Sequence, residues 1–185
     1  LRRALGAEGE RIRTEAAAGC LLAAQRELEA GRADAATALY DATRQANVPT
    51  ALRVGATRGA ILARGAEGIP LLAGLLRSED LALRNVALLT IRAMPSAALA
   101  DELHAAIRDA GGESRALLIT ALLDCHTARS AAAVRRQLDQ GTPEVRAAAL
   151  RVLGRIGGVD DTGPLLGVAR ASRSPAETAW RWTHS

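Results

Sequence analysis

An internal repeat of 31 residues constrains the fold of this chain more than any other feature. Four arginines stand on this offset, at Arg53, Arg84, Arg115 and Arg146. Except at Thr57, the positions three, four and seven residues after each arginine are apolar, which is the spacing of one face of an α-helix. The same offset aligns Leu72 with Leu103, Val134 and Leu165, and Leu76 with Ile107, Leu138 and Ala169. Each repeat is therefore predicted to be a helix, a short break and a second helix.

Turn-forming residues stand where this pattern needs breaks. They are Gly65 and Gly68, Ser78–Asp80, Met94–Ser96, Gly111 with Gly112, and Gly141–Pro143. Thr142 before Pro143 predicts a helix start with a hydroxyl cap, and Ser174–Glu177 repeats this start as a capping box for a fifth, truncated unit. Neither helix can bury its stripe within one unit, so neighbours must cover each other. We predict an all-α fold, an α-solenoid of antiparallel helical hairpins over residues 47–185.

The first 46 residues do not follow the repeat. Glu15–Glu29 and Asp34–Gln45 read as two helices around Gly31, with small residues near Tyr40 in a pattern that resembles a tetratricopeptide hairpin. Residues 1–46 are therefore predicted to be an irregular N-terminal helical cap, within which residues 1–13 carry weak signals of order. Because the chain starts at Leu1 without a methionine or signal sequence, we expect a monomer or a piece of a larger chain.

Composition argues against a nucleic-acid partner. The net charge of +4 and the pI of 10.3 come from 24 arginines without any lysine, and 20 acidic residues are interspersed among them. A high-GC coding bias produces the same picture. The chain has no Phe, and no aromatic residue lies between Tyr40 and Trp180 to stack on bases. A core without large aromatics must be thin, as in layers of helix pairs packed through Ala and Leu.

The sequence offers no set of residues with recognisable chemistry. Cys20 and Cys125 lie in apolar helical stretches and are expected to be buried free thiols. The histidines, His104, His126 and His184, lack partners at metal-ligand spacing, and no nucleophile–base arrangement or phosphate-binding loop is present. No apolar run approaches 18 residues, so no membrane span is expected. We predict no catalytic residue, no metal and no cofactor, and therefore not an enzyme.

The repeated arginines and one tryptophan are the candidate partner-binding residues. Stacked helices would align Arg53, Arg84, Arg115 and Arg146 along one edge, where they could grip an anionic partner. Each of the last three also follows an acidic helix start, at Asp80, Glu113 and Glu144. We therefore interpret the row mainly as structural, through ion pairs with these carboxylates. Trp180 is expected to contact a further unit or a partner.

The segment Thr142–Gly157 resembles the first helix of HEAT repeats of the short, phycobilisome-lyase-like class, and Asp80–Leu89 resembles a degraded copy. The resemblance covers roughly residues 47–185. It implies a right-handed superhelix and a non-catalytic scaffold that binds a protein partner. The alternatives that it leaves open are a bilin lyase-like subunit and a nucleic-acid-binding or DNA-repair HEAT-like protein. The chain is also similar to large HEAT-repeat proteins of high-GC bacteria, which leaves the compartment open between cytoplasm and export.

One departure from the HEAT pattern concerns two glycines. Gly55 and Gly59 lie four residues apart inside the first predicted repeat helix. Each costs about 1 kcal/mol of helix propensity relative to alanine. We expect close approach of a neighbouring helix to compensate for both.

Overall fold

The computed structural model describes residues 2–158, 161–163 and 167, and these residues form helices and connecting turns without any strand. The predicted all-α class is confirmed for this part of the chain. The chain divides into two compact units, Leu1–Met94 (unit 1) and Pro95–Ser185 (unit 2). This division reflects packing, whereas the predicted boundary at residues 46 and 47 reflects the repeat register and stays a prediction.

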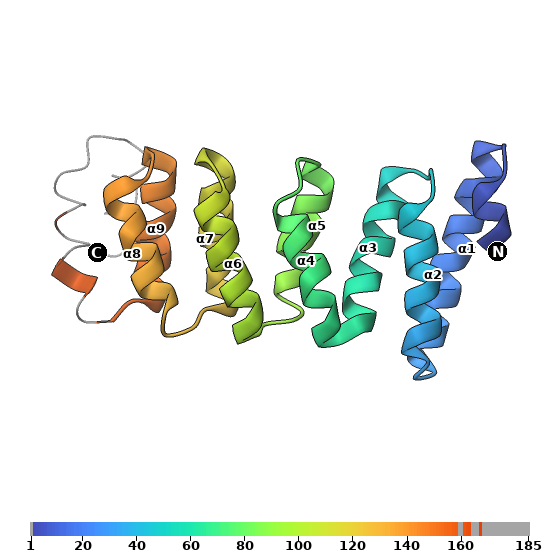
Figure 1. The fold of residues 1–185 in the computed structure, drawn as a ribbon, viewed down its shortest axis with the longest axis horizontal. Helices are drawn as coiled ribbons and strands as arrows, with labels where there is room; N and C mark the ends of the chain where they lie inside the picture. Colours follow the sequence, from blue (N-terminus) through green and yellow to red (C-terminus); the bar gives the residue numbers. More distant parts are fainter. Residues whose placement is uncertain (1, 159–160, 164–166, 168–185) are drawn as a thin grey trace. The chain divides into compact units, whose positions relative to one another are not determined.

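Unit 1 begins with a short 3-10 helix, and five α-helices follow it among the described residues (Figure 1). The elements are η1 (Arg2–Gly6), α1 (Glu10–Glu29), α2 (Ala33–Gln45), α3 (Thr50–Arg64), η2 (Gly65–Gly68), α4 (Ile69–Leu76) and α5 (Leu81–Ile91). The two helices predicted before residue 47 correspond to α1 and α2, with an earlier start for α1. Consecutive helices run in alternating directions.

Unit 2 contains four α-helices in its described residues. They are α6 (Ala97–Asp109), α7 (Gly112–Cys125), α8 (Ser130–Gln140) and α9 (Pro143–Ile156). Within this unit α6 packs on α7, α7 on α9, and α8 on α9. The break between α7 and α8, His126–Arg129, contains neither glycine nor proline, so turn-forming residues alone do not predict it.

The helix starts follow the predicted turns, although not every cap forms as expected. Asp80 caps α5 by accepting from the backbone N–H groups of Ala82 (2.9 Å) and Leu83 (3.3 Å), and Ser96 caps α6. Thr142 is the N-cap of α9, but its hydroxyl makes no cap hydrogen bond. The nearby Glu144 carboxylate has a lowered pKa, caused by its own backbone amide and by the Thr142 side chain.

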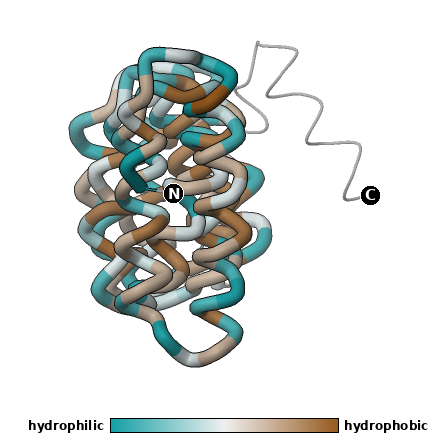
Figure 2. The backbone as a smooth tube through the Cα atoms, turned by 90° about the vertical axis from the view of Figure 1, so that its right-hand side faces the viewer, coloured by the Kyte–Doolittle hydropathy of each residue, from teal (hydrophilic) through white to brown (hydrophobic). Residues whose placement is uncertain are grey.

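The interior of unit 1 is built mainly from small side chains. One cluster joins η1, α1 and the turn before α3, and its buried members are Leu5, Ala16, Ala17, Cys20 and Val48. A second joins α1, α2 and α3, and its buried members are Ala24, Ala36, Tyr40 and Ala60. Hydrophobic and hydrophilic residues alternate along the backbone at helical spacing (Figure 2). These helices therefore approach closely instead of interlocking through large side chains.

The first residues are ordered, contrary to the weak signals in their sequence. The side chain of Leu5 is buried in the first cluster. The Arg13 guanidinium donates to the backbone oxygens of Ala7 (2.8 Å), Glu8 (2.9 Å) and Asn47 (3.0 Å). This single side chain therefore links the segment before α1 to the turn before α3, a long-range contact that local sequence does not reveal.

The two glycines of α3 have different environments. A Cβ on Gly59 would lie 2.6 Å from the Cδ1 and Cζ atoms of Tyr40, so the tyrosine ring of α2 packs directly on the glycine backbone. A Cβ on Gly55 would lie 3.8 Å from Cδ1 of Leu21, which is an ordinary contact. The expected compensation by close approach is therefore confirmed for Gly59 and wrong for Gly55, because α1 stays one side-chain layer away there.

We expect opposite stability effects from alanine at these two positions. Gly59→Ala should destabilise unit 1 by about 1–3 kcal/mol, because overpacking against Tyr40 outweighs the gain in helix propensity. Gly55→Ala should stabilise it by up to about 1 kcal/mol. Urea unfolding followed by circular dichroism measures both. Equal effects of the two substitutions would contradict this account of the α2–α3 contact.

One helical stretch is long and apolar enough to cross a membrane by length and composition alone. It is Thr50–Leu76, with a mean hydropathy of 1.3 and one-third (33%) of its most apolar window buried. The stretch comprises α3, η2 and α4, and Gly65, with φ of 55°, turns the chain between them. Core helices of helical proteins pass the same test, so the expected absence of a membrane span stays a prediction.

Candidate functional site

The repeated arginines of unit 1 lie half-buried on neighbouring helices. Arg53 on α3 forms an ion pair with Asp80, with 3.2 Å between Nη2 and Oδ2, and Asp80 is also the cap of α5. Arg84 on α5 occupies the equivalent place. The Nε atoms of both arginines are buried without a hydrogen-bond partner. Asp80 therefore pairs with the arginine of the preceding repeat, and pairing within or between repeats was left open by the sequence.

In unit 2 the equivalent arginines turn back to the backbone before their own helix. Arg115 Nε donates to the Ala110 carbonyl oxygen (2.8 Å), and Arg146 Nη1 donates to the Gly141 carbonyl oxygen (3.0 Å). Both acceptors lie five residues before the arginine. These bonds satisfy carbonyl groups near the end of the preceding helix. The geometry gives these arginines a structural role and leaves a partner-binding role for the row as a prediction.

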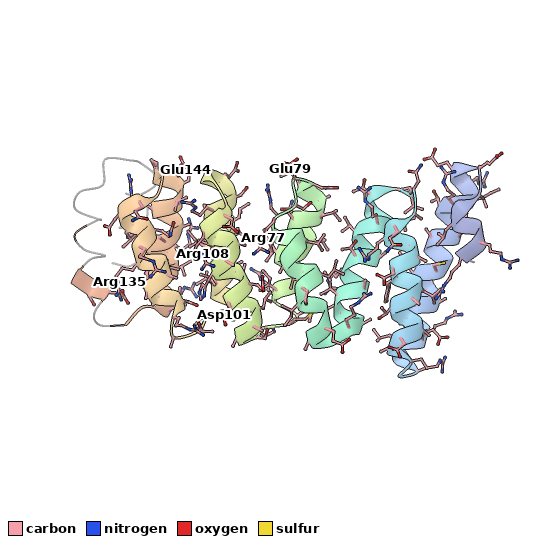
Figure 3. The ribbon with its side chains drawn as sticks, viewed as in Figure 1. Arg77, Glu79, Asp101, Arg108, Arg135 and Glu144 are labelled. Atoms are coloured by element: carbon pink, nitrogen blue, oxygen red, sulfur yellow. The ribbon has the colours of Figure 1, made fainter. Side chains whose placement is uncertain are left out.

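The remaining candidate, Trp180, lies outside the described residues, as do the predicted capping box at 174–177 and the fifth unit. Asp161, which lies after α9, is buried. Its carboxylate accepts from Arg135 Nε on α8 (2.6 Å) and from the Gly158 N–H (3.0 Å) (Figure 3). This ion pair joins the segment after α9 to α8.

The cap and the ion pair of Asp80 can be separated by mutation. Asp80→Ala removes both and should destabilise unit 1 by roughly 0.5–2 kcal/mol. Asp80→Asn keeps an oxygen that caps α5 and loses only a half-exposed ion pair, so it should cost a few tenths of a kcal/mol. Thermal unfolding of both variants measures the difference. If the asparagine variant were as unstable as the alanine variant, the Arg53 contact would outweigh the cap.

A contact between α6 and the start of α8 brings together three residues that resemble a hydrolase triad. His104 Nε2 lies 3.0 Å from Ser130 Oγ, and His104 Nδ1 lies 3.8 Å from Asp101 Oδ1. Sequence reasoning found no such set, because 26 residues separate the histidine from the serine. The signal that was available is that both residues lie on the second helices of consecutive repeats, α6 and α8.

Burial and hydrogen bonding make this set a structural lock. Ser130 is fully buried (0% exposed), and its Oγ already accepts from the Thr127 N–H at 2.9 Å. The separation between Asp101 and His104 exceeds a hydrogen bond, so the carboxylate does not orient the ring. A nucleophile needs room for a substrate at its oxygen, and Ser130 has none. The contact therefore fixes the start of α8 against α6.

Burial lowers the pKa of His104 below its usual 6.5, an effect that Asp101 opposes and Arg129, Arg108 and Arg136 reinforce. The unfolded chain thus takes up a proton at a higher pH than the folded chain. The resulting stability is present in full above about pH 6.5 and is lost as pH falls through the lowered folded pKa. Acidification therefore weakens the His104–Ser130 lock.

We expect the stability of unit 2 to fall as the pH drops below about 6.5, with a smaller fall in His104→Gln. The glutamine keeps a polar group near Ser130 without taking up a proton. Urea unfolding at a series of pH values measures the slope, and the exposed His126 provides the matched control His126→Gln. A slope unchanged in His104→Gln but reduced in His126→Gln would contradict the assignment.

A cavity of about 330 Å³ lies beside this lock, between α6, α7 and α8. We call it the α6–α8 cavity. Its lining residues are His104, Ile107 and Arg108 from α6, Arg115 from α7, and Ala133, Arg136, Gln137 and Gln140 from α8. The residues from α6 and α8 recur at three- and four-residue spacing, so each helix presents one face to the cavity. Arg108 lies on the side of α6 that faces α8 (Figure 3).

The cavity is strongly basic. Three of its eight lining residues are arginines and none is acidic. Arg108 and Arg136 are exposed, and none of the three arginines forms an ion pair within the part of the chain that the structure describes. Gln137 contributes an Oε1 atom that is buried without a hydrogen-bond partner. A ligand here meets positive charge and one unsatisfied acceptor.

The two cysteines are buried free thiols, as predicted. Burial, together with Asp124, raises the pKa of Cys125 to about 11, which keeps the thiol protonated and unreactive at neutral pH. Among the described residues, no group of three or more His, Cys, Asp or Glu side chains is arranged to hold a metal ion. The α6–α8 cavity, which lies in the described residues, is therefore a candidate ligand-binding site.

Comparison of the chain with protein-family models, with curated proteins and with solved structures finds no match. The resemblance to HEAT repeats thus stays a prediction. Function has to be argued from the helices and their surfaces alone.

Proposed function

We propose that this chain is a non-catalytic helical-repeat scaffold that binds a protein partner, with its repeats arranged as an α-solenoid. One observation carries the proposal. Helices related by the 31-residue repeat pack directly on each other, α3 on α5 in unit 1 and α7 on α9 in unit 2. Side-by-side packing of equivalent helices is the contact by which a repeat array extends.

The chemistry of the described surface supports binding more than catalysis. The Ser130 oxygen is buried and already bonded, and the Cys125 thiol is protonated, so neither offers an accessible nucleophile. The basic groups are all arginines, which suit hydrogen-bonded contacts with carboxylates on a partner. A protein segment that carries Asp and Glu is the partner that this surface favours.

Selection from a displayed library of random peptides tests the proposal on the intact chain. We expect enrichment of acidic peptides whose binding weakens as salt rises, because exposed charges are screened. Hydrogen exchange should show protection by the bound peptide on a surface formed by helices of successive repeats. Neutral peptides of equal length are the control. An absence of enrichment, or protection restricted to one loop, would contradict a scaffold role.

A further inference from the structure

We propose that the α6–α8 cavity is a binding site for a phosphate monoester that carries a neighbouring hydrogen-bond donor. The inference does not depend on the scaffold proposal, because the cavity lies within unit 2 and needs no partner protein. It stands on the charge, the arrangement and the size of the cavity.

The positive charge of the cavity favours an anionic ligand. Arg108, Arg115 and Arg136 line one space, and the lining contains no carboxylate to neutralise them. Like charges gathered in this way oppose each other, and a bound anion relieves that repulsion. Arg53 and Arg135 each have an acidic partner, in Asp80 and Asp161, whereas the cavity lining contains no carboxylate.

The arrangement favours a phosphoryl group over a carboxylate. One arginine can satisfy a carboxylate with its two parallel N–H donors, whereas this cavity places arginines from three different helices around the same space. A phosphate monoester has three terminal oxygens and a charge of about −1.5 to −2 at neutral pH. The Nε of Arg115 is held by the Ala110 carbonyl oxygen, so its terminal nitrogens remain for the ligand.

The remainder of the cavity indicates what the phosphate is attached to. Its volume of about 330 Å³ is in the range of small-molecule sites and exceeds the size of a single inorganic anion. Ile107 and Ala133 provide an apolar surface for a short carbon chain. Gln137 lines the cavity, and its Oε1 has no hydrogen-bond partner, so we expect this side chain to turn toward a ligand that carries a hydroxyl or N–H group near the phosphate.

Binding to the purified, full chain tests this assignment with three probes. Glycerol 3-phosphate carries a hydroxyl group, ethyl phosphate does not, and a phosphoserine peptide is compared with its unphosphorylated form. Calorimetry gives the affinities. The ring proton signals of His104, which lines the cavity, give a second and local measure. A bound dianion offsets Arg108 and Arg136, so it should raise the pKa of His104.

Arg108→Gln and Arg136→Gln should each weaken glycerol 3-phosphate binding at least about tenfold, because each removes a charge-assisted contact. Arg151→Gln is the matched control, since Arg151 is an exposed arginine on α9 outside the lining, and it should change affinity by less than about twofold. Gln137→Leu should weaken binding of glycerol 3-phosphate and leave that of ethyl phosphate unchanged. Circular dichroism confirms that each variant is folded.

The outcomes separate the two sources of a phosphate monoester. Binding of glycerol 3-phosphate alone supports a small-molecule ligand, whereas binding of the phosphoserine peptide, and not of its unphosphorylated form, supports a phosphorylated partner segment. If none of the probes saturates the chain or raises the pKa of His104, the proposal is wrong. It is equally wrong if the arginine cavity variants bind as tightly as Arg151→Gln, since the phosphate would then bind elsewhere. The wild-type His104 measurement decides the matter even if a variant fails to fold.

Discussion

The close approach of alanine-rich helices is the constraint on which the rest of the structure depends. Ala17, Ala24, Ala36, Ala56 and Ala60 are all fully buried, and each removes little apolar area from water. The helices gain stability from many short contacts instead of a few large side chains. A small shift of one helix then breaks many contacts at once. The residues at the helix starts, caps and turns must therefore hold each helix accurately in place.

Several polar contacts maintain this placement at the helix ends. Asp80 caps α5 and binds Arg53 of the preceding repeat, and the Arg13 guanidinium links the segment before α1 to the turn before α3. In unit 2 the arginines at equivalent positions bind carbonyl oxygens before their own helices, and His104 holds the start of α8 through Ser130. The arginines at the repeated position thus all help to hold a helix end in place. They do so through different partners, because the preceding turns differ in sequence.

The sequence predicts features that depend on nearby positions in the chain. It misses contacts that depend on which other helix lies nearby in space. Most helix boundaries follow from apolar periodicity and turn residues, since both act within a few positions, but the early start of α1 and the break between α7 and α8 do not. The partner of Arg53, the Tyr40 ring on Gly59 and the order of η1 depend on which helix end lies nearby, and no local pattern encodes that. Thr142 shows the same limit on a shorter scale, because its hydroxyl makes no cap hydrogen bond although its residue type and position predict one.

The α6–α8 cavity escapes sequence analysis because its residues lie just beside the apolar stripes. His104 and Arg108 flank the stripe of α6, and Arg136 and Gln137 flank that of α8, where charged residues are ordinarily assigned to a solvated face. Only the packing of α6, α7 and α8 shows that the positive charges share one space without acidic partners. A repeat pattern predicts the apolar contacts between helices well. It predicts the cavities beside those contacts poorly.

The tyrosine on the α3 glycine also gives the molecule a built-in reporter. Tyr40 is the only tyrosine and the chain contains no phenylalanine, so every tyrosine ring signal in the proton spectrum comes from this one residue. It lies in unit 1, pressed against a backbone surface that exists only when α2 and α3 are docked. The imidazole ring of His104 reports on unit 2, through a different part of the proton spectrum. The folding of each unit can therefore be observed separately in the unmodified chain, without labels or added chromophores.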